Sequence, residues 1–191
     1  MASQPERVIL TYDDIAQLPT DRHRYELFEG ELQVTAAPNT AHQTIVTNLA
    51  TTLNVHVRRN RLGRVFIAPY DVLLSDITVV EPDLLFVSRE RQSIIRPSYI
   101  RGVPDLVVEV LSPSNPQTDR QVKRQLYARH GVPYYWLLDP DQREFIAYAL
   151  ESGAYRQVAV AHENATVSAP PLTDLAIPLA EVWDDADSSS Q

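Results

Sequence analysis

The chain has 191 residues, no cysteine and a formal net charge of -8 at pH 7. The lack of cysteine excludes disulfides and thiolate metal sites and is compatible with a reducing cytoplasm, where we expect the protein to reside. The acidic balance argues against a protein that binds polyanions over its whole surface. No apolar run approaches the roughly 18 residues of a membrane span, and residues 1–6 lack the basic and apolar regions of a signal peptide.

The first predicted elements are a short helix, a hairpin and a long amphipathic helix. The short helix covers residues 12–15 and ends before a proline. Residues 24–35 (RYELFEGELQVT) alternate apolar and polar side chains around Glu29-Gly30, and this pattern indicates a β-hairpin. A capping-box pattern at Thr40 opens a helix whose apolar side chains recur at helical spacing as far as the arginines at 58–61.

Two predicted strands follow, at residues 65–74 and 78–87, and each contains one proline. Proline cannot donate a hydrogen bond to a neighbouring strand. Pro69 and Pro82 therefore indicate sheet edges or bulges.

The stretch from Pro104 to Pro140 carries the strongest pattern in the sequence. Residues 106–111 (LVVEVL) are apolar except for Glu109, as is typical of a strand buried on both faces. A turn and a capping box at 118–121 lead into a helix that ends before a glycine, and residues 134–138 (YYWLL) form the next strand. One helix between two strands is a connection long enough for a parallel βαβ unit.

The last part of the chain predicts a second hairpin, formed by residues 145–150 and 155–160 around Ser152-Gly153. The remainder is rich in loop residues, with a short element at its end. We predict one α/β domain over residues 1–183, with a mixed central sheet flanked by helices. The tail at residues 184–191 is acidic, and we expect it to be disordered.

Two carboxylates on neighbouring predicted strands are candidates for a metal site. Glu109 lies in a strand buried on both faces, where a carboxylate needs a metal ion or a cation as partner. Period-two alternation can place Asp83 opposite Glu109, about 5 Å away, whereas Asp105 lies about 13 Å along the strand, too far to share one ion. Asp83 and Glu109 suit Mg²⁺ or Mn²⁺. The plainer interpretation is that Asp83 only begins a strand.

Lys123 is the only lysine among 17 basic residues. Hydrolysis of a phosphodiester needs positive charge beside the attacking water and the developing oxyanions. A lysine ammonium is a compact charge of the kind that this chemistry uses. The alternative interpretation is an exposed Asp119–Lys123 ion pair on the surface of the helix.

Several of these residues together resemble the Uma-type family of restriction endonucleases, within the PD-(D/E)XK nuclease superfamily. The resemblance covers about residues 10–150. It rests on these segments: YEL and GEL at 25–32, His42, Pro82-Asp83, DLVVEVLSP at 105–113, Lys123 with Tyr127, and GVPYYW at 131–136. The superfamily implies an αβββαβ core, a divalent metal ion and a nucleic-acid substrate.

The resemblance also implies roles for individual residues. Asp83 and Glu109 would be the metal-binding and catalytic carboxylates. The superfamily pattern has a lysine where this chain has Leu111, and relatives of this kind carry the lysine on the following helix, which fits Lys123 as the third catalytic residue. Three further residues are additional candidates for the site: Glu31, His42 and Tyr127. An exposed hairpin charge and a histidine at a helix start are the plainer interpretations of the first two.

The favoured function is metal-dependent hydrolysis of DNA by a restriction-endonuclease-like enzyme. Two alternatives stay open. One is a nuclease fold that has lost cleavage and serves in binding or assembly, which the net charge of -8 and Leu111 favour. The other is a hydrolase of a small phosphorylated ligand. Contact with DNA would come from local basic clusters, at residues 58–64 or around Arg120 and Arg124. Exposed edge strands also make a homodimer an expectation.

Overall fold

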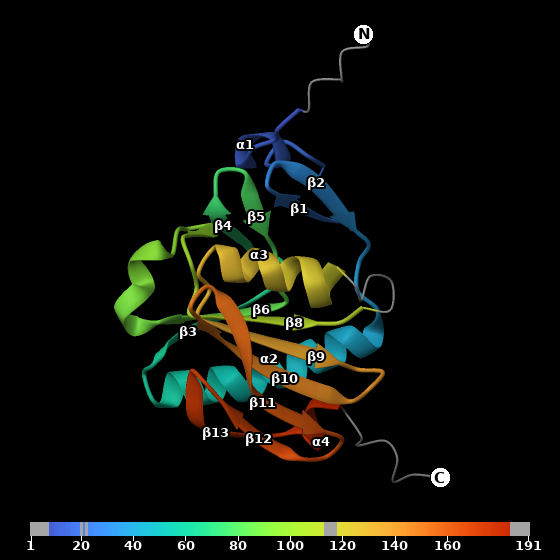
Figure 1. The fold of residues 1–191 in the computed structure, drawn as a ribbon, viewed down its shortest axis with the longest axis vertical. Coiled ribbons are helices and arrows are strands. Elements are labelled where there is room, and N and C mark those ends of the chain that lie inside the picture. The colour runs from blue at the N-terminus through green and yellow to red at the C-terminus, as the bar shows by residue number, and fades with distance from the viewer. Residues whose placement is uncertain (1–7, 20, 22, 113–117, 184–191) are drawn as a thin grey trace.

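The computed structural model describes residues 8–19, 21, 23–112 and 118–183. Figure 1 shows α1 and the N-terminal hairpin at one end of the molecule, a large sheet across its middle, and a small hairpin with α4 at the other end. The helical elements are α1 (Tyr12–Ile15), α2 (Thr40–Arg59), η1 (Arg89–Ile94), the π-helix η2 (Thr118–Lys123), α3 (Arg124–Arg129) and α4 (Leu179–Trp183). The strands are β1 (Arg24–Phe28), β2 (Glu31–Thr35), β3 (Gly63–Ile67), β4 (Asp71–Ser75), β5 (Thr78–Val80), β6 (Leu84–Ser88), β7 (Tyr99–Arg101), β8 (Leu106–Val110), β9 (Tyr134–Asp139), β10 (Glu144–Glu151), β11 (Ala154–His162), β12 (Thr166–Ala169) and β13 (Leu172–Pro178).

The central sheet has six strands in the order β11-β10-β9-β8-β6-β3. β8 and β9 are parallel and are joined through η2 and α3, whereas the other neighbouring pairs are antiparallel. In chain order, α2, β3, β6, β8, α3 and β9 form the predicted αβββαβ core. The β1–β2 hairpin turns at Glu29-Gly30 as the sequence indicated, because both residues adopt positive φ angles. The fold class is therefore confirmed.

The two prolines of the predicted strands mark the places where the chain changes sheet. β3 and β6 pair in the six-stranded sheet, while β4 and β5 pair in a second sheet of order β2-β1-β5-β4-β7. The prediction of continuous strands at 65–74 and 78–87 was therefore wrong, because proline has no N–H to donate and each strand ends beside one. β7, which runs parallel to β4, was not predicted. After Pro82 the chain re-enters the central sheet, and Asp83 lies at that point.

Every residue of β8 is buried, because the central sheet is covered on both faces. α2 lies against one face, and α3 with the second sheet lies against the other (Figure 1). Val108 and Val110 pack into the cluster that contains the apolar face of α2, whereas Val107 and Leu111 pack into the cluster that contains α3. Glu109 has the parity of the second pair, so its side chain enters the layer between the sheet and α3.

The C-terminal third differs from its prediction in one element. The β10–β11 hairpin turns at Ser152-Gly153 as predicted. β12 and β13 form a further hairpin where we expected loop. Alternate residues of β12 pack into the α2 cluster, but the prolines between the two strands obscured this pattern in the sequence. Residues 184–191, the predicted disordered tail, lie outside the described residues.

Among the described residues, no helix combines the length and the apolar composition that crossing a membrane requires.

Candidate active site

The antiparallel pairing of β6 with β8 brings Asp83 and Glu109 to one side of the central sheet. Leu84 is paired with Val108. In an antiparallel pair, the residue before Leu84 and the residue after Val108 also face each other, and these are Asp83 and Glu109. Each of these two carboxylate residues is 1% exposed. Both line a cavity of about 50 Å³. Its other charged or ionisable walls come from β1, α2 and η2: Arg24, Glu26, His42 and Lys123.

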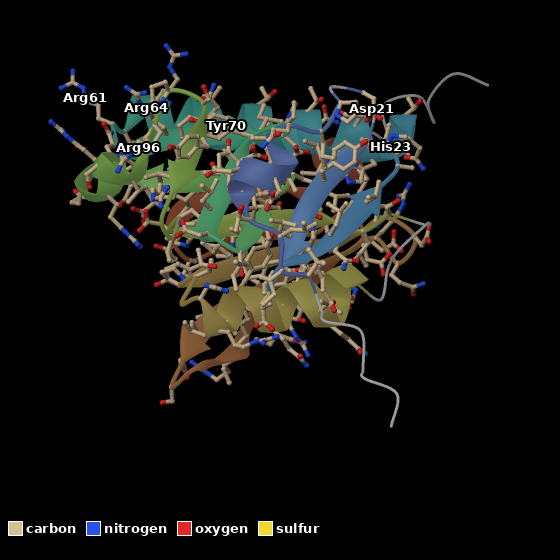
Figure 2. All side chains as sticks on the ribbon, turned by 90° about the horizontal axis from the view of Figure 1, so that it is seen from above. Asp21, His23, Arg61, Arg64, Tyr70 and Arg96 are labelled. Atoms are coloured by element: carbon tan, nitrogen blue, oxygen red, sulfur yellow. The ribbon has the colours of Figure 1, made fainter. Side chains whose placement is uncertain are left out.

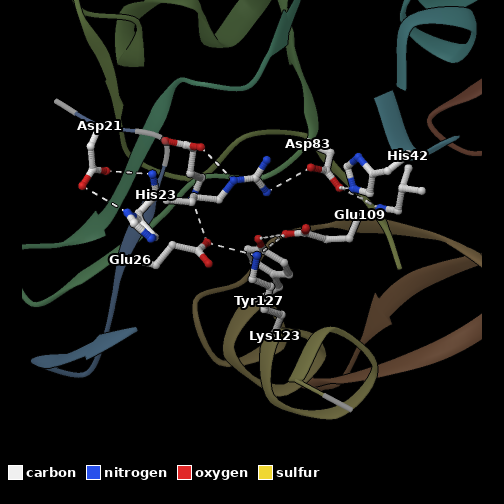
Figure 3. Close-up of polar contacts among 11 residues, drawn as sticks. Asp21, His23, Glu26, His42, Asp83, Glu109, Lys123 and Tyr127 are labelled. Atoms are coloured by element: carbon white, nitrogen blue, oxygen red, sulfur yellow. Dashed lines mark hydrogen bonds and ion pairs between the residues drawn. The ribbon is translucent and has the colours of Figure 1, made fainter. Parts of the chain in front are cut away.

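Asp83 is held by three groups from three different elements. Nη1 of Arg24 donates to Oδ1 at 3.0 Å, the backbone N–H of Val110 donates to Oδ2 at 2.8 Å, and Nε2 of His42 lies 3.1 Å from Oδ2 (Figure 3). Burial alone would raise the pKa of Asp83, but the hydrogen bond with His42 and the charge of Arg24 outweigh it and lower that pKa to about 2. The carboxylate therefore stays ionised over the physiological range.

Glu109 is held from the opposite side by η2 and α3. The hydroxyl of Tyr127 donates to Oε1 at 2.6 Å, and Nζ of Lys123 lies 3.1 Å from the same oxygen. Burial, together with the charge of Glu109, raises the pKa of Tyr127 well above its usual value. Tyr127 therefore remains a protonated donor, and it fixes the orientation of Glu109.

Lys123 lies at the junction between a π-helical turn and α3, in the helical segment after β8, and its side chain lines the cavity. Residues 118–123 form a π-helix, and α3 continues it from Arg124. Lys123 and Tyr127 are four residues apart, so both side chains lie on the face toward the sheet, and both are buried. A π-turn of this kind is frequent at functional sites. The side chains of the predicted capping box at 118–120 lie outside the described residues, as do residues 113–117 of the turn before it.

Glu26 is a site residue that the sequence analysis did not identify. Its Oε1 lies 3.0 Å from Nζ of Lys123 and accepts the backbone N–H of Glu81 at 2.9 Å. Lys123 therefore lies between two carboxylates, Glu26 and Glu109. In the sequence, Glu26 occupies a polar position of an alternating hairpin, which predicts exposure. The position is buried because β1 lies inside the second sheet, between β2 and β5, and the Glu26 side chain faces the cavity that Lys123 also lines.

Arg24 contacts Glu81 as well as Asp83, and so links these two carboxylates. Nε of Arg24 lies 2.8 Å from Oε1 of Glu81, and the two side chains are 16% and 15% exposed. Burial lowers the pKa of Arg24, but Asp83 and the neighbouring carboxylates raise it more, so the guanidinium stays charged. Burial also raises the pKa of Glu81 to about 7, against the opposing effect of Arg24.

Two of the carboxylates considered in the sequence lie outside this cluster. Glu31 is exposed on β2 and does not line the cavity. Asp105 lies just before β8, where it accepts the backbone N–H of Ser88 at 2.7 Å and pairs with Arg91. It therefore has structural partners of its own, at a distance from Glu109 along the strand.

The arginine clusters do not line the cavity within the described residues. Figure 2 shows Arg61, Arg64 and Arg96 at one end of the molecule, whereas Asp21 and His23 lie at the opposite end. Arg64 pairs with Val87 at the far end of β6 from Asp83. Arg124 packs over the ring of Tyr148 on β10, 5.5 Å from its centroid, and does not line the cavity. The side chain of Arg120 lies outside the described residues.

The residues of the cavity fit a hydrated divalent cation in their chemistry. Within the described part of the chain, no three His, Asp or Glu side chains form a ready-made metal site. Magnesium needs fewer protein ligands, because it binds through one or two carboxylates and keeps several waters. Asp83 and Glu109 supply two carboxylates to one cavity. Nδ1 of His42 is buried without a partner among the described residues, and a buried polar atom of this kind requires water or a ligand.

Comparisons with known proteins bear on the family and the fold of the chain. The Uma2 family model, described as "Putative restriction endonuclease", matches residues 12–180. The fold resembles a crystal structure from Anabaena variabilis described as a "putative nuclease belonging to DUF820", with a TM-score of 0.75 and 23% identity over 91% of this chain and 97% of that chain. No curated protein matches the sequence.

Proposed function

The chain belongs to the Uma2 family, and from this premise we propose that it is a metal-dependent endonuclease that hydrolyses DNA. The observation that carries the proposal is the charge of the buried cluster. The cluster contains four carboxylates, on Glu26, Glu81, Asp83 and Glu109. Their ion-pair partners are two basic side chains, Arg24 and Lys123. With all six groups ionised, the cluster has two more negative than positive charges.

A buried excess of two negative charges costs free energy unless a cation or a proton compensates it. A divalent cation is the matching partner. The pKa of Glu81, raised to about 7 by burial, indicates that a proton on this carboxyl can offset one charge of the excess, and a bound cation would take the place of that proton. Mg²⁺ or Mn²⁺, which prefer oxygen ligands, would be held by Asp83 and Glu109.

Each protein group then has a defined task in phosphodiester hydrolysis. A bound ion would supply Lewis-acid polarisation of the phosphoryl group and a more acidic water. Arg24 and His42 keep Asp83 ionised and oriented, and Tyr127 orients Glu109. The ammonium group of Lys123 lies beside Glu109, where it would orient the attacking water or stabilise the developing oxyanions.

The size of the cavity distinguishes a polymeric substrate from a small one. A site that encloses a small organic ligand has about 300–1,000 Å³, whereas this cavity has about 50 Å³. A cavity of this size would take only the reacting phosphoryl group or a metal ion, while the rest of the substrate would stay outside. This favours a nucleic-acid chain over a small phosphorylated ligand.

The burial of Lys123 argues against a module that has lost cleavage. Burial of an ammonium and two carboxylates is costly, and apolar replacements of similar volume are often as stable or more so. Lys123 is 3% exposed and is held by Glu26 and Glu109. A binding module would not require this arrangement, whereas hydrolysis would.

Cleavage of plasmid and linear DNA tests the proposal. Protein with Mg²⁺ or Mn²⁺ should nick or linearise plasmid, and EDTA should abolish the reaction. Glu109→Gln should be inactive, whereas Asp105→Asn, a matched carboxylate change at the other end of the same strand, should cleave like the parent. No cleavage of any DNA with either metal, by protein shown to be folded, would contradict the proposal.

A further inference from the structure

One edge of the Arg24 guanidinium is left without a protein partner. Nη1 donates to Asp83, and Nε lies against Glu81. Nη2 donates no hydrogen bond among the residues that the structure describes. Because a guanidinium carries five N–H donors in a fixed plane, its contacts with Asp83 and Glu81 leave the Nη2 edge available to a ligand.

The same guanidinium is charged, fixed and exposed to the cavity. Its pKa is lowered by burial but raised more strongly by Asp83 and the other carboxylates, so it stays protonated. Asp83 and Glu81 hold it from two directions, which limits its rotation. Arg24 also lines the cavity that contains Glu109 and Lys123. A fixed cationic donor of this kind is typical of phosphate recognition.

We propose that the Nη2 edge of Arg24 binds a non-bridging oxygen of the scissile phosphate. This inference rests on the proposed function and makes Arg24 a catalytic residue of that reaction. Arg24 and Lys123 line the same cavity of about 50 Å³, so both cationic side chains would face a phosphate group bound there. Glu81 is then a positioning residue, since it contacts Arg24 and does not line this cavity.

Binding of inorganic phosphate, measured by calorimetry in the presence of Ca²⁺, tests the contact apart from cleavage. Ca²⁺ offsets the negative excess of the cluster. Arg24→Lys keeps the positive charge beside Asp83 but removes the planar fork. Its phosphate affinity should fall about 10- to 100-fold, as expected for loss of a charge-assisted hydrogen bond. Arg156→Lys, a matched change at an exposed arginine that pairs with Glu151, should bind phosphate like the parent. Unchanged affinity in Arg24→Lys, or no saturable phosphate binding by the parent, would overturn the inference.

A second measurement uses the parent protein, so it does not depend on whether a variant folds. In an NMR titration with phosphate, the Nε–H resonance of Arg24 should shift with saturation, and that of Arg156, which donates to Glu151, should not. An unshifted Arg24 resonance at saturating phosphate would overturn the contact. The two proposals fail separately: phosphate binding through Arg24 without DNA cleavage rejects the nuclease, and cleavage by an Arg24→Lys variant at the parental rate rejects the subsite.

Discussion

Nζ of Lys123 lies 3.1 Å from Oε1 of Glu109, although the two residues come from different elements. Leu111, at the position where the superfamily pattern has a lysine, is buried among apolar side chains between the central sheet and α3. The helix after β8 therefore brings to Glu109 a cation that the strand itself does not provide. A catalytic role of Lys123 stays a prediction.

Replacement of Lys123 by alanine should lower the rate of DNA cleavage about 10²–10³-fold, because the variant lacks the charge that stabilises developing oxyanions. Mn²⁺ affinity, measured by calorimetry, should change little. Addition of Leu111→Lys should restore part of the rate, since position 111 lies about 6.6 Å beyond Glu109 on the same strand face. Cleavage by Lys123→Ala at the parental rate would show that this lysine is not required.

Glu109→Gln should abolish metal binding and raise thermal stability in metal-free buffer. The change removes one unit of the negative excess while the amide keeps an oxygen that can accept from Tyr127. We expect a gain of about 1 kcal/mol in EDTA and no further stabilisation by Mn²⁺. Calorimetric scans with and without Mn²⁺ measure both effects. Asp105→Asn is the control, and equal Mn²⁺ affinity in parent and Glu109→Gln would refute the expectation.

The sequence predicted those parts of the fold in which local pattern and final environment agree. The apolar run around Glu109 is a strand covered on both faces, and Glu29-Gly30 supplies the positive φ angles of a tight hairpin turn. The halves of the two proline-containing strands could not be assigned, because a change of sheet at Pro69 or Pro82 depends on long-range pairing.

The same limit applies to the candidate site. Asp83 and Glu109 could be paired from strand parity, which is a local property. Glu26 could not, because its burial depends on the pairing of β1 with β5 and on the approach of Lys123 from η2, which are long-range contacts. Arg24 was missed for the same reason. DNA as substrate, the metal ion and the homodimer are not tested by the fold and stay predictions.

In EDTA, stability should fall as pH rises from about 5 to 8. The pKa of Glu81 is raised from 4.5 to about 7 by burial, so the folded state binds this proton more tightly than the unfolded chain. That contribution is complete below pH 4.5 and is lost as pH rises through 7. Asp83 has the opposite shift, to about 2, and affects stability only at lower pH.

Urea unfolding at several pH values measures this effect. The change should be of order 1–2 kcal/mol, less than the full shift implies, because Glu81 is partly solvated. Glu81→Gln should show a flatter profile between pH 5 and 8, and saturating Mg²⁺ should reduce the slope for the parent. A parental profile as flat as that of Glu81→Gln would contradict the assignment of this proton to Glu81.

Glu26→Gln should slow DNA cleavage about 10-fold while leaving the KM for DNA nearly unchanged. The amide can still accept the backbone N–H of Glu81, but Lys123 loses one of its two anionic partners and is held less firmly beside Glu109. Glu151→Gln, which removes a glutamate paired with an exposed arginine, is the matched control and should change neither quantity. A Glu26→Gln variant with the parental rate would restrict Glu26 to a structural role.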